Sequence, residues 1–381
     1  MKRIGLLLHI YQPPTQDRSV VERIDAECYR PVASLLARTG AKVTLNINYS
    51  LTEQLSKAGS TTLDDLSRAG GVEFTGSGAF HPLLPLIPEA EMDRQIALNT
   101  LGNERLLGPS YAPRGFFPPE MAVSPGVLGR LAALGFEWAV ADDLPWVASG
   151  RDAPYDWVPS CRGLRVLLRS NFWSNRIAFH GGWGDEVAAD IVRGLEAWAG
   201  TDADAYLIVA MDGETFGHHR RGGVETFLEP FLASFAQGGA DVVLDTLSGI
   251  AGAFPARDAE VPPGSWSTTP EDIAAGKPWP LWDDPDCPDH AALRALLSHV
   301  LSSARASGSE RVAALADRML YSCPFWWASP GRRSPLQVRR GIQAILETAL
   351  AVFELDGDRR FMDEVMSAAG RVPSMCAKDG N

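Results

Sequence analysis

The sequence predicts an α/β fold in which parallel strands alternate with helices and form a closed or nearly closed barrel. The chain has 381 residues and is 45% hydrophobic, enough for a barrel of about 250 residues and a smaller appendage. Short aliphatic runs alternate with amphipathic helical patterns, about seven times before residue 247. Several of these runs end in a His or an acid beside Pro or Gly. The carboxyl ends of parallel strands carry the sites of such folds, so we expect these polar side chains to converge.

The order of the elements predicts two domains. We expect a barrel over residues 1–255, followed at 256–381 by a loop-rich segment and a helical domain that contributes aromatics to the site. The expected strands are residues 3–9, 43–48, 72–77, 115–117, 136–141, 206–212 and 241–244, with shorter strand-like runs at 164–169 and 176–179. The expected helices are 20–38, 51–57, 62–69, 89–107, 185–198 and 224–236, then 289–304, 310–320, 335–353 and 360–369 in the second domain.

Charge and cysteine usage limit the partners. The net charge is −12 and Lys and Arg form no cluster, so nucleic acid and anionic membrane surfaces are not expected partners. No apolar run is long enough to span a membrane or to act as a secretory signal. The five Cys are scattered without a C-x-x-C pair, which predicts reduced thiols in the cytoplasm. We expect a neutral substrate, and neither a metal nor another cofactor.

The most informative stretch is the apolar run that ends at Asp212. It is followed by Glu214, Phe216 and His218, so two carboxylates and a His lie where a buried strand opens into a loop. Asp212 could instead cap the following helix. A cap would leave Glu214 and His218 unexplained, so we interpret the stretch as part of a site.

Similar polar groups follow other expected strands. His9 and Gln12 precede two prolines, and His81 lies in a loop that prolines also bound. Glu120 follows a short strand among apolar residues, where an isolated carboxylate is costly without a partner or a function. Taken alone, His9 or His81 would more often be a hydrogen-bonded structural residue than a catalytic one, but their shared placement after strands shifts that balance toward a site. We interpret Asp142 and Asp143 as a solvated turn.

Tryptophans in polar or Pro-flanked loops suggest a carbohydrate site. An indole can stack on a pyranose ring and donate its N–H to a hydroxyl, although some of the 11 Trp must fill the core. The loop at 170–176 carries Trp173 and is of the sort that lines a sugar site. The other candidates lie after residue 255: Trp266, Asp272, Trp282, Trp326 and Trp327.

These segments together resemble glycoside hydrolase family 57. The resemblance spans roughly residues 4 to 330 in the order of the family's five motifs. The matching segments are His9-x-Tyr11-Gln12-Pro13, Gly78…His81-Pro82, Gly115-Phe116-Phe117-Pro118-Pro119-Glu120, Met211-Asp212-Gly213-Glu214-Thr215-Phe216-Gly217-His218 and Phe325-Trp326-Trp327-Ala328-Ser329. The segment with Trp266, Asp272 and Trp282 also resembles a stretch that many members share.

The resemblance implies an incomplete (β/α)7 barrel followed by a helical domain, and retaining cleavage of α-glucans. It places the nucleophile at Glu120 and the general acid/base at Asp212. Retaining chemistry needs two carboxyl groups about 5–5.5 Å apart. His9, His81 and His218 would then bind sugar hydroxyls, and Glu214 could raise the pKa of Asp212 by like-charge repulsion.

Alternatives remain open at this stage. Glucan transfer or branching could use the same two carboxylates, and the shortness of the chain favours hydrolysis only as an argument from missing sequence. A glucan-binding protein without turnover is a second alternative, which the presence of both carboxylates disfavours. A metal-dependent carbohydrate deacetylase or mannosidase would place His9, His81 and Asp212 around a divalent ion. The usual H-x-D and H-x-x-x-H patterns are missing from the sequence.

Overall fold

The computed structural model describes residues 1–236 and 242–376, which form two compact units. The first unit contains Met1–Gln12, Gln16–Ala79 and Leu84–Pro270, and the second contains Pro13–Thr15, Phe80–Leu83 and the chain from Glu271 onward. The predicted division after residue 255 stays a prediction. In the described ranges, no helix combines the length and apolar character required to cross a bilayer.

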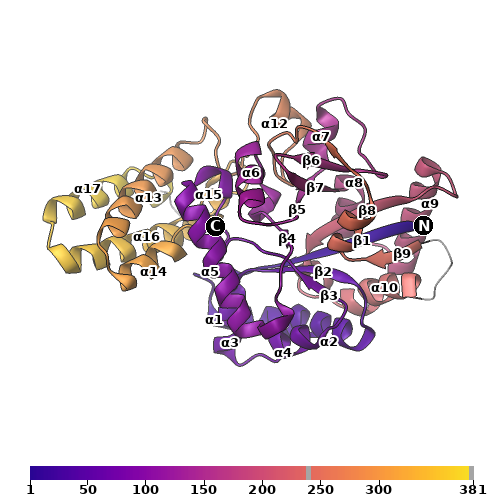
Figure 1. The fold of residues 1–381 in the computed structure, drawn as a ribbon. Helices are drawn as coiled ribbons and strands as arrows, with labels where there is room; N and C mark the ends of the chain where they lie inside the picture. The colour runs from indigo at the N-terminus through magenta and orange to yellow at the C-terminus, as the bar shows by residue number, and fades with distance from the viewer. Residues whose placement is uncertain (237–241, 377–381) are drawn as a thin grey trace. The chain divides into compact units, whose positions relative to one another are not determined.

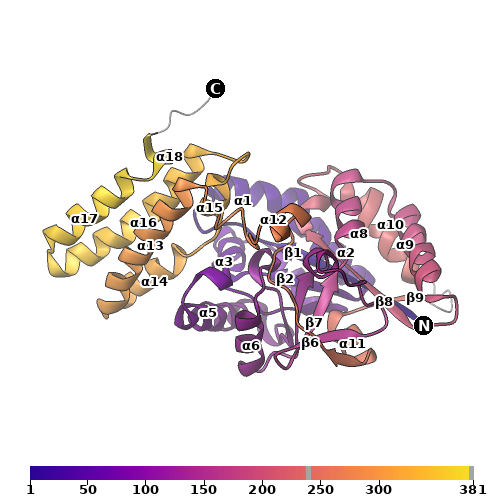
Figure 2. The ribbon, with the colours of Figure 1, turned by 90° about the horizontal axis from the view of Figure 1, so that it is seen from above.

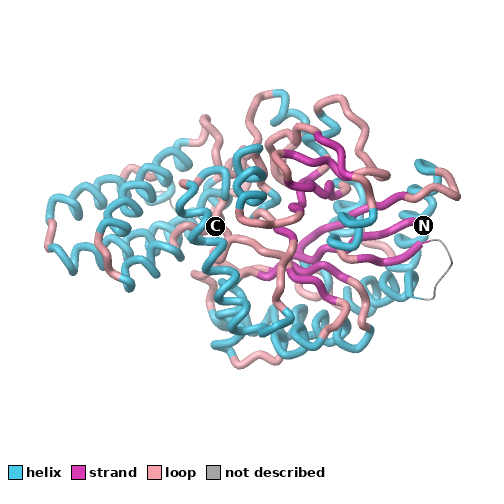
Figure 3. Tube along the Cα trace, in the orientation of Figure 1, coloured by secondary structure: helices cyan, strands magenta, loops and turns pink. Residues whose placement is uncertain are grey.

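Parallel strands of the first unit form a barrel-like sheet (Figure 1; Figure 3). The strands are β1 Lys2–Ile10, β2 Val43–Ile47, β3 Val72–Phe74, β4 Gly115–Phe116, β5 Trp138–Asp142, β6 Val158–Cys161, β7 Leu164–Arg169, β8 Ala205–Asp212, β9 Val242–Asp245 and β10 Ala256–Asp258. Parallel pairing runs from β8 through β1 and β2 to β3, and from β4 through β5 to β7. A parallel bridge between Gly76 and Phe116 joins β3 to β4, and the pair Arg169 and Ile208 joins β7 to β8. Seven strands therefore complete a ring, as expected for a (β/α)7 barrel.

Helices of the first unit cover this sheet (Figure 1; Figure 2). They are α1 Arg18–Ile24, α2 Arg30–Thr39, α3 Tyr49–Ala58, α4 Thr62–Arg68, α5 Glu89–Leu107, α6 Pro125–Ala133, α7 Leu144–Ala148, α8 Asn171–Asn175, α9 Gly184–Ala199, α10 Glu229–Ala236 and α11 Leu247–Ala253. Three π-helical segments adjoin them: η1 Asp25–Tyr29, η5 Arg176–His180 and η7 Val224–Leu228. Short 3₁₀ turns include η4 Pro119–Met121 and η6 Gly213–Phe216.

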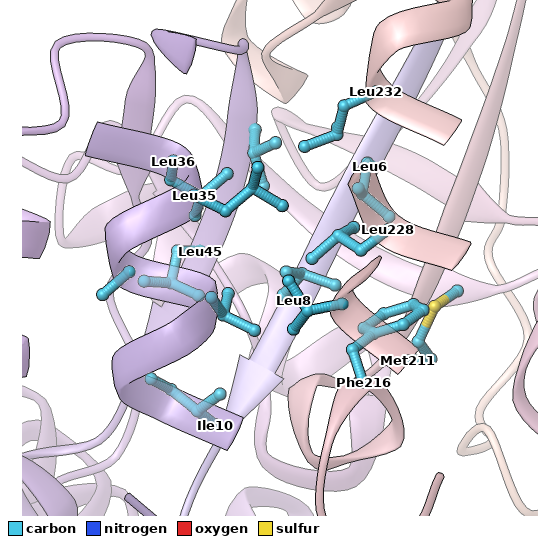
Figure 4. Close-up of a cluster of buried hydrophobic side chains, with 14 of the residues drawn as sticks. Leu6, Leu8, Ile10, Leu35, Leu36, Leu45, Met211, Phe216, Leu228 and Leu232 are labelled. Atoms are coloured by element: carbon cyan, nitrogen blue, oxygen red, sulfur yellow. The ribbon is translucent and has the colours of Figure 1, made fainter. Parts of the chain in front are cut away.

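β1 is the central strand of the barrel. It pairs with β2, β8 and β9, and eight of its nine residues are buried, in agreement with the apolar run at residues 4–8. Its side chains Leu6, Leu8 and Ile10 lie in one apolar cluster with residues of α2, β8 and η7 (Figure 4). This packing fixes the carboxyl ends of β1 and β8 next to each other.

The second unit is helical. It contains α13 Pro288–Ala306, α14 Glu310–Arg318, α15 Cys323–Ala328, α16 Pro335–Asp356, α17 Arg359–Gly370 and α18 Pro373–Cys376, with α12 Pro270–Ala274 at its start. In Figure 2 the long helices α13, α16 and α17 lie side by side. All four helices predicted for this region are confirmed. They were recognisable in the sequence because each has a complete apolar stripe.

Three local predictions need correction. Residues 176–179 belong to the π-helix η5 and form no strand, and the polar loop at 170–176 contains the helix α8. Asp142 and Asp143 form no solvated turn, since they are only 4% and 9% exposed. Among the described residues, Arg169 is the ion-pair partner of Asp142, a buried pair that no local pattern reveals. For the last predicted strand, residue 241 lies outside the described residues and β9 covers Val242–Asp245.

Candidate active site

Asp212 and His9 lie side by side at the carboxyl end of the barrel. They are paired residues of the parallel strands β8 and β1, whose backbones are therefore about 4.8 Å apart. Asp212 is half-buried and His9 is 4% exposed. Burial raises the pKa of Asp212, while the neighbouring His9 and Arg169 act in the opposite direction. The arrangement favours a carboxyl that holds its proton more firmly than an exposed aspartate does.

A hydrogen bond orients the His9 imidazole. Burial lowers the pKa of His9, whereas Asp212 and Asn46 raise it by smaller amounts, and its Nδ1 lies 2.6 Å from the Asn46 side-chain oxygen. Asn46 in turn donates to Thr75 Oγ1 over 2.9 Å, which fixes its amide with the oxygen toward His9. His9 Nδ1–H is therefore the donor, and the imidazole is oriented for contact with a polar ligand.

Glu120 is held in a strained backbone conformation. It follows β4 in the turn η4 and has φ of 59° and ψ of 16°, in the left-handed region that non-glycine residues rarely adopt. Among the described residues, four non-glycine positions have positive φ, and they include His81 as well as Glu120. Strain of this kind costs about 1–3 kcal/mol and is concentrated at functional sites. Glu120 also accepts a hydrogen bond from the Trp266 indole, with 2.9 Å between Oε2 and Nε1.

An aromatic cluster links the two carboxyl groups. The His9 ring stacks on Phe117, with centroids 4.6 Å apart and planes 12° apart. Trp266 meets both rings edge-on, each at a centroid distance of 5.8 Å. Trp266 binds Glu120, and His9 is the strand partner of Asp212, so the cluster connects the segments that carry the two carboxyl groups. The predicted separation of Glu120 and Asp212 stays a prediction.

Glu214 lies behind Asp212 in a buried hydrogen-bond network. Its Oε1 accepts the Tyr29 hydroxyl in a short hydrogen bond, and also longer bonds of 3.4 Å from Gln12 Nε2 and the Tyr11 amide. Glu214 is 6% exposed. Burial and the nearby Asp212 raise the pKa of the Glu214 carboxyl, whereas Tyr29 and the Tyr11 amide lower it. Glu214 is therefore held by hydrogen bonds from neighbouring protein groups and has little contact with solvent.

Comparison with known proteins decides the family. The model of glycosyl hydrolase family 57 matches residues 9–261, which include every group described above except Trp266. The chain belongs to glycosyl hydrolase family 57. The computed fold agrees, since a 4-alpha-glucanotransferase from Thermococcus litoralis superposes with a TM-score of 0.76 at 18% identity, over 91% of this chain and 59% of that one. A family 57 branching enzyme from Pyrococcus horikoshii gives 0.72 at 15% identity, over 100% and 98% of the two chains.

Curated relatives are named for different activities. An alpha-amylase of Pyrococcus horikoshii is 29% identical over 156 residues, 39% of this chain and 24% of the relative. A probable 1,4-alpha-glucan branching enzyme of Mycobacterium tuberculosis is 27% identical over 272 residues, 59% of this chain and 49% of the relative. The chain thus spans between about a quarter and half of these relatives.

The other predicted residues of this family 57 chain lie in varied settings. Gln12, 8% exposed, supports Tyr29 and Glu214, and His218 bonds Glu27 across 2.9 Å while remaining partly exposed. Trp173 is half-buried and packs beside the Arg176 guanidinium. Phe216 is fully buried and stacks on Phe227. We therefore leave Phe216 out of the proposed binding set.

Five predicted residues belong to the second unit. His81, buried with φ of 58°, lies 3.2 Å from Ser322 Oγ through its Nδ1. Trp282 is 1% exposed and fills the core, so we leave it out of the binding set as well. The remaining three are accessible: Asp272, Trp326 and Trp327 are half-buried.

Sequence reasoning missed four contributors to this geometry. Tyr29 lies on a π-helix, Asn46 lies inside a buried strand, and Phe117 was named within an expected strand and a motif without a role of its own. Their roles depend on contacts between distant segments. Arg169 was detectable, because it ends β7 as Asp212 ends β8. Within residues 1–236 and 242–376, no group of three or more His, Cys, Asp or Glu is arranged to hold a metal ion.

Proposed function

We propose that this family 57 protein cleaves α-glucans with retention of anomeric configuration, with Glu120 as nucleophile and Asp212 as general acid/base. The observation that supports this most directly is the cluster of His9, Phe117 and Trp266, which binds Glu120 through Trp266 and adjoins Asp212 through the strand pairing of His9. The family membership and the amylase, branching and glucanotransferase activities named for its relatives support the substrate class. The cysteine pattern supports a cytoplasmic setting.

The reaction runs in two displacements. The Glu120 carboxylate attacks the anomeric carbon while the protonated Asp212 gives its proton to the leaving glycosidic oxygen, so the C–O bond breaks and a glycosyl ester forms. Asp212, now ionised, removes a proton from an incoming hydroxyl, which attacks the same carbon and releases Glu120. The Trp266 N–H stabilises the Glu120 carboxylate, and the left-handed backbone aims it.

Glu214 adjusts the proton affinity of Asp212. Burial and the charge of Asp212 raise the pKa of Glu214 to about 8, and by the same repulsion an ionised Glu214 would raise the pKa of Asp212. Tyr29 and Gln12 hold Glu214 in place. Asp212 is therefore able to keep a proton in the free enzyme and lose it in the first displacement.

Hydrolysis and transfer differ only in the acceptor of the glycosyl group. We propose hydrolysis of α-1,4 bonds as the main outcome. The shortness of the chain no longer favours it, since this chain aligns with 98% of a branching enzyme. Transfer or branching is the second candidate, because a curated match over 272 residues is to a probable branching enzyme.

Substitution of the two carboxyl groups tests the proposal. Glu120→Gln and Asp212→Asn should each lower turnover of maltoheptaose by at least about 10³-fold, since each removes a group that acts in the transition state. Circular dichroism should show an intact fold. Glu137→Gln is a matched control, because Glu137 forms an exposed ion pair with Arg114. Full activity in either site variant would exclude the assigned roles.

A further inference from the structure

A buried Arg–Asp pair lies beside the proposed site and has no role in the reaction described above. Arg169 ends β7, Asp142 ends β5, and their side chains are only 4% and 1% exposed. A buried ion pair adds little stability over apolar residues of similar volume, because both charges lose their hydration. Stability alone is therefore a weak explanation for this pair, and its position invites a functional one.

The Arg169 guanidinium is fixed at all three nitrogens. Nη1 forms the ion pair with Asp142, Nη2 donates to Asn175 Oδ1 over 2.9 Å, and Nε donates to the Ala210 carbonyl over 2.8 Å. Ala210 lies on β8 two residues before Asp212, so the cation is held against the strand that carries the proposed acid/base. The Asp142 carboxylate is itself oriented by the Leu144 amide and the Asn171 side chain.

The same guanidinium lies over the indole of Trp266, which is the hydrogen-bond partner of the proposed nucleophile Glu120. Its central carbon lies 5.9 Å from the centre of the Trp266 ring, whose N–H binds Glu120. A cation over an indole favours one orientation of the ring. Arg169 therefore contacts the strand that carries Asp212 and the indole that binds Glu120. Among the described residues, no hydrogen bond is recorded between Arg169 and either of these carboxyl groups.

We propose that Arg169 is a positioning residue for both Asp212 and Trp266, and that Asp142 holds it in place. The inference rests on the proposed function of Glu120 and Asp212. Arg169 offsets the burial of Asp212 and so lets this carboxyl ionise in the second displacement. The Asp142 charge weakens the electrostatic effect of Arg169 on Asp212, and its ion pair prevents the guanidinium from rotating toward Asp212.

Electrostatics agree with this assignment. The Arg169 charge lowers the pKa of Asp212 against the effect of burial, and His9 on β1 acts in the same direction. The charge of Asp212 raises the pKa of Glu214, which lies on η6. Among the described residues, Asp143 is a further titratable group beside the ion pair, and Tyr155 lies near Asp143.

Infrared difference spectroscopy tests the proposal directly. The C=O band of a protonated carboxyl, taken as the difference between each protein and the same protein with Asp212→Asn, reports the pKa of Asp212 without turnover. Asp142→Asn leaves the Arg169 charge less neutralised and should lower that pKa. The double variant Asp142→Asn with Arg169→Gln removes both charges, keeps amide hydrogen bonding, and should raise the pKa by about 1 unit. Opposite shifts support the proposal; no shift, or shifts in one direction, overturns it.

Two controls separate this proposal from the function on which it rests. Asp93→Asn breaks another Arg–Asp pair, with Arg130, and should not move the Asp212 titration; an equal shift there would also overturn the proposal. If the double variant fails to fold, the shift in Asp142→Asn decides. Activity on maltoheptaose is measured in parallel. If the Asp212 pKa shifts in opposite directions in the two variants but the wild-type protein shows no activity, only the proposed function is rejected. If the wild-type protein is active but the Asp212 pKa does not shift in the variants, only the role of Arg169 is rejected.

Discussion

Single side chains set the protonation pattern of this site. The carboxyl ends of two paired strands carry Asp212 and His9, and Glu214 follows one of these strands. Burial shifts the pKa of each of the three groups in the direction that favours its neutral form. Tyr29 opposes that shift for Glu214 by donating a hydrogen bond. The positions of the first three residues were predictable because they follow apolar strands. Tyr29 was not predictable, since nothing local distinguishes it from a core tyrosine.

Loss of the Tyr29 hydroxyl should affect both stability and activity. Tyr29→Phe leaves Glu214 without its shortest hydrogen bond, so the free energy of unfolding should fall by about 1–3 kcal/mol and maltoheptaose turnover should fall. Urea unfolding and initial rates measure the two effects. Tyr206→Phe is the matched control, because its hydroxyl donates to the Trp157 carbonyl. It should lower stability and leave kcat unchanged. Equal kcat in both variants would contradict a role for Tyr29 in the site.

Asp143 predicts a pH effect on stability. Burial and the adjacent Asp142 raise the pKa of Asp143 to about 7, so the folded state holds this proton more tightly than the unfolded state. Its contribution is complete below about pH 4 and is lost as the pH rises to about 7. Asp143→Asn should therefore be more stable than the wild type at pH 8, by up to about 4 kcal/mol, with little difference at pH 4. Urea unfolding at both pH values measures this, and equal stability at pH 8 would contradict the assigned burial.

Close packing between elements supports the same network. Gly217 directly follows the turn η6. A Cβ at this position would lie 2.1 Å from the Glu27 carbonyl oxygen. Glu27 lies on the π-helix η1, which also carries Tyr29. The close contact requires glycine, and it fixes η1 against the loop of Glu214. The sequence shows Gly217 inside a recognisable motif but does not show what approaches it.

Substitution of Gly217 should therefore disturb the site. In Gly217→Ala the clash with backbone must displace η1, and we expect a loss of about 1–3 kcal/mol in the free energy of unfolding together with lower activity. Gly252→Ala is the control, because Gly252 lies in α11 with nothing within 4 Å of the added Cβ. It should be neutral or stabilising by about 0.5–1 kcal/mol. Thermal melts and rates compare the two, and an unaffected Gly217→Ala would show that η1 can shift at no cost to the site.

At the scale of the whole molecule, the repeating pattern of strands and helices was readable from the sequence. The long helix α5 and the long strands β1 and β8 were located almost to the residue, because the helical pattern is long and each strand contains an apolar run bounded by polar residues. Short elements were missed or misassigned: β6 and the π-helix η5 have too few residues for a period. The burial of Asp142 and Asp143 was also missed, since it depends on Arg169 from another strand.

The products should show which acceptor the whole protein favours. Incubation with maltoheptaose should give shorter maltooligosaccharides as the main products if water reaches the glycosyl ester first. Chromatography and NMR of the anomeric protons distinguish this from transfer. Longer or branched products as the majority would replace hydrolysis with transfer and leave the roles of the two carboxyl groups unchanged.

Trapping the covalent intermediate tests the central claim most directly. A 5-fluoro-α-glucosyl fluoride should form a glycosyl ester that turns over slowly, and peptide mass spectrometry should locate it. We expect the added mass on Glu120, and no labelling in Glu120→Gln. A label on a different residue, or first products with inverted anomeric configuration, would contradict the account.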